Sequence, residues 1–145
     1  LPYADYVFCN ESEAEAYGKK HGIGSDGTDL AAVALKVCGM PKVNGARSRV
    51  VVFTQGSKST IVAKDGKTTE YAVTPLAAEA LVDTNGAGDT FAGAIVFGSM
   101  QGWDGARLAS FACAAAALKC MQRGNRSALP KLNEVEAFLK RRSAG

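Results

Sequence analysis

The sequence lacks any hydrophobic run long enough to cross a membrane. Its longest apolar stretch, "FACAAAAL" at 111–118, is far shorter than the roughly 20 residues that a spanning helix needs. The first residues, "LPYADYVF", also lack the basic and then apolar pattern of a secretion signal. We therefore expect a cytoplasmic protein that does not associate with membranes.

Metal-ligand and disulfide patterns are missing as well. The single histidine, His21, has no ligand spacing with any cysteine, and no two cysteines form a C-x-x-C pair. The net charge is only +3, and no basic stripe with interleaved aromatic residues suggests a nucleic-acid partner. We expect reduced, buried thiols at all four cysteines, which are Cys9, Cys38, Cys113 and Cys120.

Runs typical of strands alternate with runs typical of helices, which predicts an α/β fold with a mostly parallel sheet flanked by helices in three layers. Asp65-Gly66 between two strand-like runs is a strong hairpin signal. Small residues in two of the helices predict a close approach between neighbouring elements. Strands are expected near 5–10, 49–54 and on both sides of 65–66, and helices near 11–22, 30–39, 87–100, 106–121 and 131–142.

The most informative stretch is "DTNGAGDTFAGA" at 83–94, a glycine-rich turn followed by a predicted helix. The first amides of a helix have no acceptor within the helix and bind anions readily. The amides of Gly86, Ala87 and Gly88 are therefore candidates for an anion hole. Asp89 beside them is a candidate general base that removes a proton from an attacking hydroxyl. The alternative is that Asp89 only complements the helix dipole.

Three segments together resemble one family. The stretch "DTNGAGDTFAGAIV" at 83–96 is similar to the C-terminal signature of the ribokinase-like (phosphofructokinase B type) carbohydrate kinases. "NESE" at 10–13 looks like the N-x-x-E element of that family, and "FTQGS" at 53–57 looks like the strand-end loop that lines its ATP site. The three segments also occur in the order that the family has.

The resemblance implies ATP with Mg²⁺ as the phosphoryl donor, and a monovalent cation is a further candidate ion. Asn10 and Glu13 would act on Mg²⁺ mainly through water. The alternative for these two residues is a helix capping box. The residues that would line the nucleotide site are Thr54, Gln55, Gly56 and Asn85.

Within the family, the three motifs are most similar to the adenosine kinase branch. This implies phosphoryl transfer from ATP to the 5′-hydroxyl of adenosine, giving AMP in purine salvage, by a protein that is a monomer when full length. Two alternatives stay open: a sugar or other nucleoside kinase of the same family, and a non-catalytic nucleotide-binding module. The apolar loop "LAAEAL" at 76–81 leaves the acceptor open, because some adenosine kinases carry a polar residue there.

The resemblance covers only the C-terminal portion of one ribokinase-like kinase domain, so residues 1–145 would form its nucleotide and phosphate side. We expect the N-terminal portion, the lid and further strands of the sheet to precede Leu1. Because most of the acceptor pocket would be absent, we expect the 145-residue chain alone to be inactive.

Overall fold

The computed structural model describes residues 1–24, 26–73 and 76–143. The chain forms two compact units, Leu1–Ala72 and Val73–Gly145. None of the helices in the described ranges has the length and apolar character needed to cross a bilayer.

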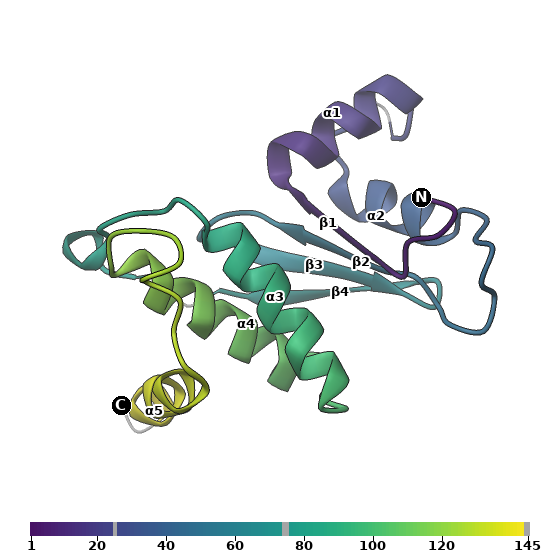
Figure 1. Ribbon diagram of the computed structural model, residues 1–145. Coiled ribbons are helices and arrows are strands. Elements are labelled where there is room, and N and C mark those ends of the chain that lie inside the picture. The colour runs from purple at the N-terminus through teal and green to yellow at the C-terminus, as the bar shows by residue number, and fades with distance from the viewer. Residues whose placement is uncertain (25, 74–75, 144–145) are drawn as a thin grey trace. The chain divides into compact units, whose positions relative to one another are not determined.

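The first unit is a four-stranded sheet with two helices, in the strand order β1-β2-β3-β4 (Figure 1). β1 and β2 are parallel, whereas β3 is antiparallel to both β2 and β4. The elements are β1 (Tyr6–Asn10), α1 (Glu11–His21), α2 (Leu30–Cys38), β2 (Val50–Thr54), β3 (Ser59–Lys64) and β4 (Lys67–Ala72).

The α/β class is confirmed, and β1 with β2 is the parallel pair among the four strands that the structure describes. A parallel pair needs a long crossover, and only the connection from β1 to β2, which contains α1 and α2, supplies one. The connections from β2 to β3 and from β3 to β4 are short turns, which return the chain directly and impose antiparallel pairing. The hairpin turn is confirmed: Asp65 and Gly66 both have positive φ, 49° and 73°, as a type I′ turn requires.

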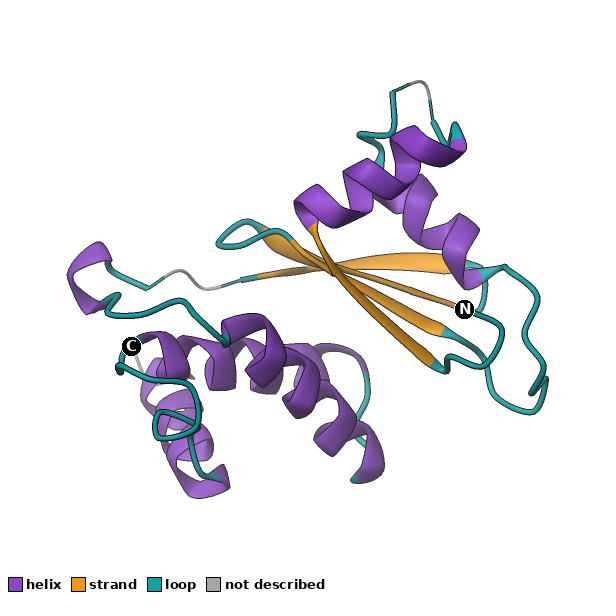
Figure 2. Cartoon of the chain, turned by 45° about the horizontal axis from the view of Figure 1, so that its top comes forward, coloured by secondary structure: helices purple, strands orange, loops and turns teal. Residues whose placement is uncertain are grey.

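Helices α1 and α2 lie together on one face of the sheet (Figure 2). The alternation of side chains along β2 sends Val51 and Phe53 into the core with these helices, while Val52 is also buried. Because both faces of β2 are apolar, its sequence reads as a continuous hydrophobic run. Buried alanines and valines, chiefly Ala14, Val33, Ala34 and Val37, complete this core.

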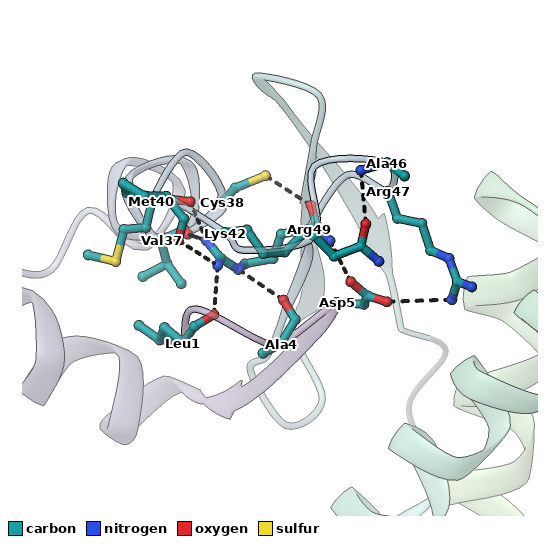
Figure 3. Close-up of polar contacts among 12 residues, drawn as sticks. Leu1, Ala4, Asp5, Val37, Cys38, Met40, Lys42, Ala46, Arg47 and Arg49 are labelled. Atoms are coloured by element: carbon teal, nitrogen blue, oxygen red, sulfur yellow. Dashed lines mark hydrogen bonds and ion pairs between the residues drawn. The ribbon is translucent and has the colours of Figure 1, made fainter.

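A buried guanidinium fastens the N-terminal segment to the end of α2 (Figure 3). Arg49 is 3% exposed, and among the described residues its guanidinium donates hydrogen bonds to five main-chain carbonyl oxygens. Three of these carbonyls lie at or just after the C-terminal end of α2, where a helix leaves carbonyls without an intrahelical partner, and two belong to the N-terminal segment. The acceptors are Leu1 (2.7 Å), Met40 (2.8 Å), Val37 (2.9 Å), Ala4 (3.2 Å) and Pro41 (3.3 Å).

The second unit is helical. Its elements are the short 3-10 helix η1 (Ala78–Ala80) and the helices α3 (Ala87–Met100), α4 (Gly105–Cys120) and α5 (Leu132–Ser143). The predicted close approach of small residues is confirmed between α3 and α4. A Cβ built on Gly98 would lie 2.5 Å from Leu108 Cδ1, so no larger residue fits without a shift. Trp103 packs against Phe111 with a centroid distance of 5.0 Å.

Candidate active site

The glycine-rich turn ends at Gly86, which is the N-cap residue of α3. Its backbone is left-handed, with φ 76° and ψ 6°, a conformation that glycine adopts without steric cost. The carbonyl of Gly86 accepts two hydrogen bonds from Thr90, one from the amide at 2.9 Å and one from the hydroxyl at 2.8 Å. These bonds fix the direction in which the first amides of α3 point.

The predicted anion-hole donors need one correction. The amide of Ala87 donates to the carbonyl of Thr84 at 3.1 Å, because the chain closes a tight turn there, so this amide is already engaged. Within the described part of the chain, the amides of Gly86, Gly88 and Asp89 donate to no protein acceptor. The donor set is therefore Gly86, Gly88 and Asp89, and the amide of Asp89 is a candidate that the sequence pattern did not single out.

The carboxylate of Asp89 is exposed and stands in the first turn of α3. It borders a cavity of about 570 Å³ within the second unit. Asp89, Gly93 and Phe97 are spaced four apart, so one face of α3 forms a wall of this cavity. A base in this place can reach a hydroxyl that enters the cavity. The absence of side chains at Gly86 and Gly88 leaves the neighbouring amides accessible.

A second acid, Asp83, connects the turn to the residues that follow α4. Its carboxylate accepts hydrogen bonds from the amide of Asn85 (3.0 Å) and from the amide of Gly124 (3.0 Å). The hydrogen bonds from Gly124 and Asn85 lower the pKa of Asp83 below its ordinary value, since they stabilise the charged form. Asn85, a predicted nucleotide-binding residue, is exposed and lies within this turn.

The buried cation beside Asp83 was not anticipated from the sequence. Lys119 at the end of α4 has a side-chain exposure of 0%, and its ammonium donates to the carbonyl of Asp83 at 2.9 Å. A lysine inside the alanine-rich run "AAAALKC" is the signal that could have revealed it, because a charge on an apolar helix face needs a partner.

In the first unit, the two other predicted motifs come together at one edge of the sheet. Asn10 and Thr54 are the last residues of the parallel strands β1 and β2, and they are partners in the register. After Thr54 the chain turns at once: the amide of Lys58 donates to the carbonyl of Gln55 at 3.1 Å, and Gly56 has φ 60°. The carboxyl edge of parallel strands is where α/β folds bind ligands.

Asn10 and Glu13 form a capping box at the start of α1. The Asn10 side chain accepts from the Glu13 amide at 2.9 Å, and the Glu13 carboxylate accepts from the Asn10 amide at 2.9 Å. The structural alternative for these residues is therefore realised. Both side chains are exposed and present the amide and carboxylate oxygens that suit Mg²⁺, which keeps several of its waters. The donor set fits an ion held mainly through water.

Comparisons with known proteins agree with this arrangement. The model of the pfkB family carbohydrate kinases matches residues 1–132. The chain is 52% identical over 102 residues to an adenosine kinase of Schizosaccharomyces pombe, an alignment that covers 70% of this chain and 29% of that protein.

Two solved structures are similar over nearly the whole chain. One is an adenosine kinase of Anopheles gambiae in complex with P1,P4-di(adenosine-5) tetraphosphate, with a TM-score of 0.76 and 33% identity over 90% of this chain and 38% of that one. The other is a ribokinase of Thermotoga maritima, with a TM-score of 0.77 and 28% identity over 94% and 42%. The chain thus spans less than half the length of these relatives, and the ribokinase-like fold is confirmed. This chain belongs to the pfkB family of carbohydrate kinases.

Proposed function

We propose that the chain is the phosphate and nucleotide side of a kinase that transfers the γ-phosphoryl group of ATP to the 5′-hydroxyl of adenosine, giving AMP. The observation that carries this proposal is the position of Asp89, whose carboxylate opens on a cavity beside the unengaged amides of Gly86 and Gly88. The adenosine kinases among the similar proteins support adenosine as the acceptor.

In this reaction Asp89 accepts the proton of the attacking 5′-hydroxyl as the oxygen approaches phosphorus. The amides of Gly86, Gly88 and Asp89 stabilise the negative charge on the phosphoryl oxygens. General-base action contributes about 100- to 10,000-fold in rate, and an anion-hole donor contributes about 100- to 1,000-fold. Thr54, Gln55 and Gly56 are the nucleotide-binding residues that we assign in the first unit. Asn85, within the turn at 83–86 (the anion turn), is the one that we assign in the second unit.

The proposal includes Mg²⁺ and considers a monovalent cation. Mg²⁺ neutralises phosphate charge when bound with ATP, and Asn10 and Glu13 would orient it through water. A monovalent cation is the second candidate, but two oxygens suited to it, the carbonyl and carboxylate of Asp83, already bind the ammonium of Lys119. A separate monovalent ion therefore does not fit at these oxygens.

The wider setting follows from the same proposal. A kinase that makes AMP from adenosine acts in purine salvage, where both substrates are small and cytoplasmic, and it needs no nucleic acid, membrane or second subunit for its chemistry. The alternative acceptors are a sugar or another nucleoside. Assays of the complete gene product with adenosine, inosine and ribose, each with ATP and Mg²⁺, distinguish these acceptors.

Replacement of Asp89 by Asn tests the proposal directly. In the complete gene product, Asp89→Asn is expected to lower turnover of adenosine by about 100- to 10,000-fold. Binding of ATP should stay within a few-fold, because the variant keeps the anion turn. Asp104→Asn is the matched control, since Asp104 is exposed at the start of α4 and makes no capping bond.

Two results would contradict the kinase assignment. Full turnover by Asp89→Asn would exclude this residue as the base. A wild-type protein that binds ATP and phosphorylates none of the acceptors would favour the non-catalytic module. The 145-residue chain alone is expected to be a poor kinase or inactive, because the alignment covers less than a third of the S. pombe relative.

A further inference from the structure

The ammonium of Lys119 is the fully buried charge of the second unit for which the proposed reaction gives no role. Its side chain has no exposed surface, although it ends in a charge. Burial of an ammonium is unfavourable unless hydrogen bonds and an opposite charge compensate for the lost water. Both are present, and both come from Asp83: the carbonyl oxygen at 2.9 Å and carboxylate Oδ2 at 3.5 Å from Nζ.

Asp83 is the residue at which the anion turn begins, and it is tied to α4 at several points. The carbonyl of Cys120, next to Lys119, accepts the amides of Val82 (2.8 Å) and Asp83 (3.1 Å). The carboxylate of Asp83 binds the amide of Gly124, which follows α4, and the amide of Asn85, which lies inside the turn. The end of α4 therefore fixes the chain immediately before the glycines.

Lys119 also packs on the turn itself. A Cβ built on Gly86 would lie 3.8 Å from Lys119 Cε and 3.1 Å from the Asn125 side-chain oxygen. Gly86, whose left-handed backbone orients the first amides of α3, thus faces the Lys119 side chain and Asn125. The nearest turn of α3 contains Asp89, so a shift of Gly86 would move both the amide donors and the base.

We propose that Lys119 is a positioning residue for phosphoryl transfer, acting as a built-in cation that holds Asp83 and, through it, the anion turn and Asp89. This inference rests on the proposed function. Lys119 is not a catalytic residue, because its buried ammonium is already bound to the carbonyl and carboxylate of Asp83. Its effect is geometric, and displacement of reacting groups by about 1 Å can cost about 100-fold in rate.

The test is Lys119→Met in the complete gene product, because methionine keeps most of the buried volume and removes the charge. The matched control is Lys140→Met, which removes the same charge from an exposed position on α5. We expect kcat per folded molecule to fall about 10- to 100-fold in Lys119→Met, with the KM values for adenosine and ATP within about 3-fold. The control should keep the wild-type kcat.

A second readout does not depend on turnover. Hydrogen exchange of the hydrogen-bonded amides within 83–89, those of Asp83, Asn85 and Ala87, should be faster in Lys119→Met than in the control, while exchange in α5 stays the same. A residue with only a bulk structural role would lower the melting temperature and leave kcat per folded molecule unchanged. If Lys119→Met does not fold, Lys119→Gln, which keeps a polar donor near Asp83, carries the same two measurements.

The outcomes separate this inference from the kinase assignment. A wild-type protein without turnover contradicts the proposed function, and the exchange measurement then decides the role of Lys119. An active wild type together with an unchanged kcat in Lys119→Met overturns the positioning role. Unchanged exchange at 83–89 overturns it as well, whether or not the protein is a kinase.

Discussion

Replacement of Gly86 and of Gly88 by alanine should have different effects on the free energy of unfolding. Gly86 has φ 76°, and a left-handed backbone costs a residue with a Cβ about 1–2 kcal/mol. The added methyl group would also lie 3.1 Å from the Asn125 side-chain oxygen, so this side chain must move. We expect Gly86→Ala to lower the free energy of unfolding by about 1–3 kcal/mol.

Gly88 sits in the first turn of α3, and a Cβ built there meets no atom within 4 Å. Since alanine is favoured over glycine in helices by up to about 1 kcal/mol, Gly88→Ala should be as stable as the wild type or more stable. The same methyl group enters the open space beside the amides that are proposed to bind the phosphoryl group. We therefore expect this stable variant to lose at least about 10-fold in turnover, given that one anion-hole donor contributes about 100- to 1,000-fold.

The assay pairs urea unfolding with steady-state kinetics for both variants of the complete gene product. The reasoning requires one variant that loses stability and another that loses turnover while its stability is kept. Gly86→Ala with wild-type stability would refute the left-handed turn. Gly88→Ala with full turnover would show that no phosphate approaches these amides, and the anion site would have to lie elsewhere.

Substitutions at three other places in the chain test further parts of the structure. Arg49→Met removes a buried donor to five carbonyl oxygens and should cost about 2–5 kcal/mol by denaturant unfolding, whereas the exposed Arg47→Met should stay within about 0.5 kcal/mol. The pKa of Asp83 is lowered in the folded state, so its stabilisation is complete above the unfolded pKa of about 3.9 and is lost as the pH falls through the lower folded value. Asp83→Asn should therefore flatten the acid side of the stability curve in thermal melts between about pH 2 and 6; an unchanged curve would contradict this. At the capping box, Asn10→Ala should cost about 1 kcal/mol, while Glu13→Gln should keep most of the stability and raise the Mg²⁺ concentration needed for half-maximal rate. An unchanged Mg²⁺ titration would restrict Glu13 to capping.

The features that the sequence predicted well are those that short-range chemistry decides. The helix at 87–100 was expected within the bounds that α3 has, since a glycine turn and an apolar run mark its start. Asp65-Gly66 closes the hairpin because both residues tolerate positive φ. The N-x-x-E spacing of Asn10 and Glu13 left capping and metal binding open, because one pair of side chains serves either purpose.

The features that the sequence did not predict depend on partners far along the chain. The engaged amide of Ala87 depends on how tightly the turn closes at Thr84, which two glycines permit without requiring. The mixed sheet depends on the length of the connection after Thr54, where the same residues were expected to line a nucleotide site. In each case the sequence identified the residues of interest, but the path of the backbone decided which hydrogen bonds and strand pairings they form.

Lys119 and Arg49 show how such a path can be fixed. Each is a cation in an apolar setting, one inside an alanine-rich helix and the other directly before the strand "VVVFT", and each binds main-chain oxygens rather than only an acid. A long cationic side chain suits this task, because it carries several N–H donors to carbonyls at a helix end or a turn. The sequence can therefore indicate that such a cation is buried, but the carbonyls it binds lie up to 48 residues away, between Arg49 and Leu1. At the anion turn, residues close together in the sequence supply the amide donors and the base. The orientation of these groups depends on Lys119, which lies far along the chain.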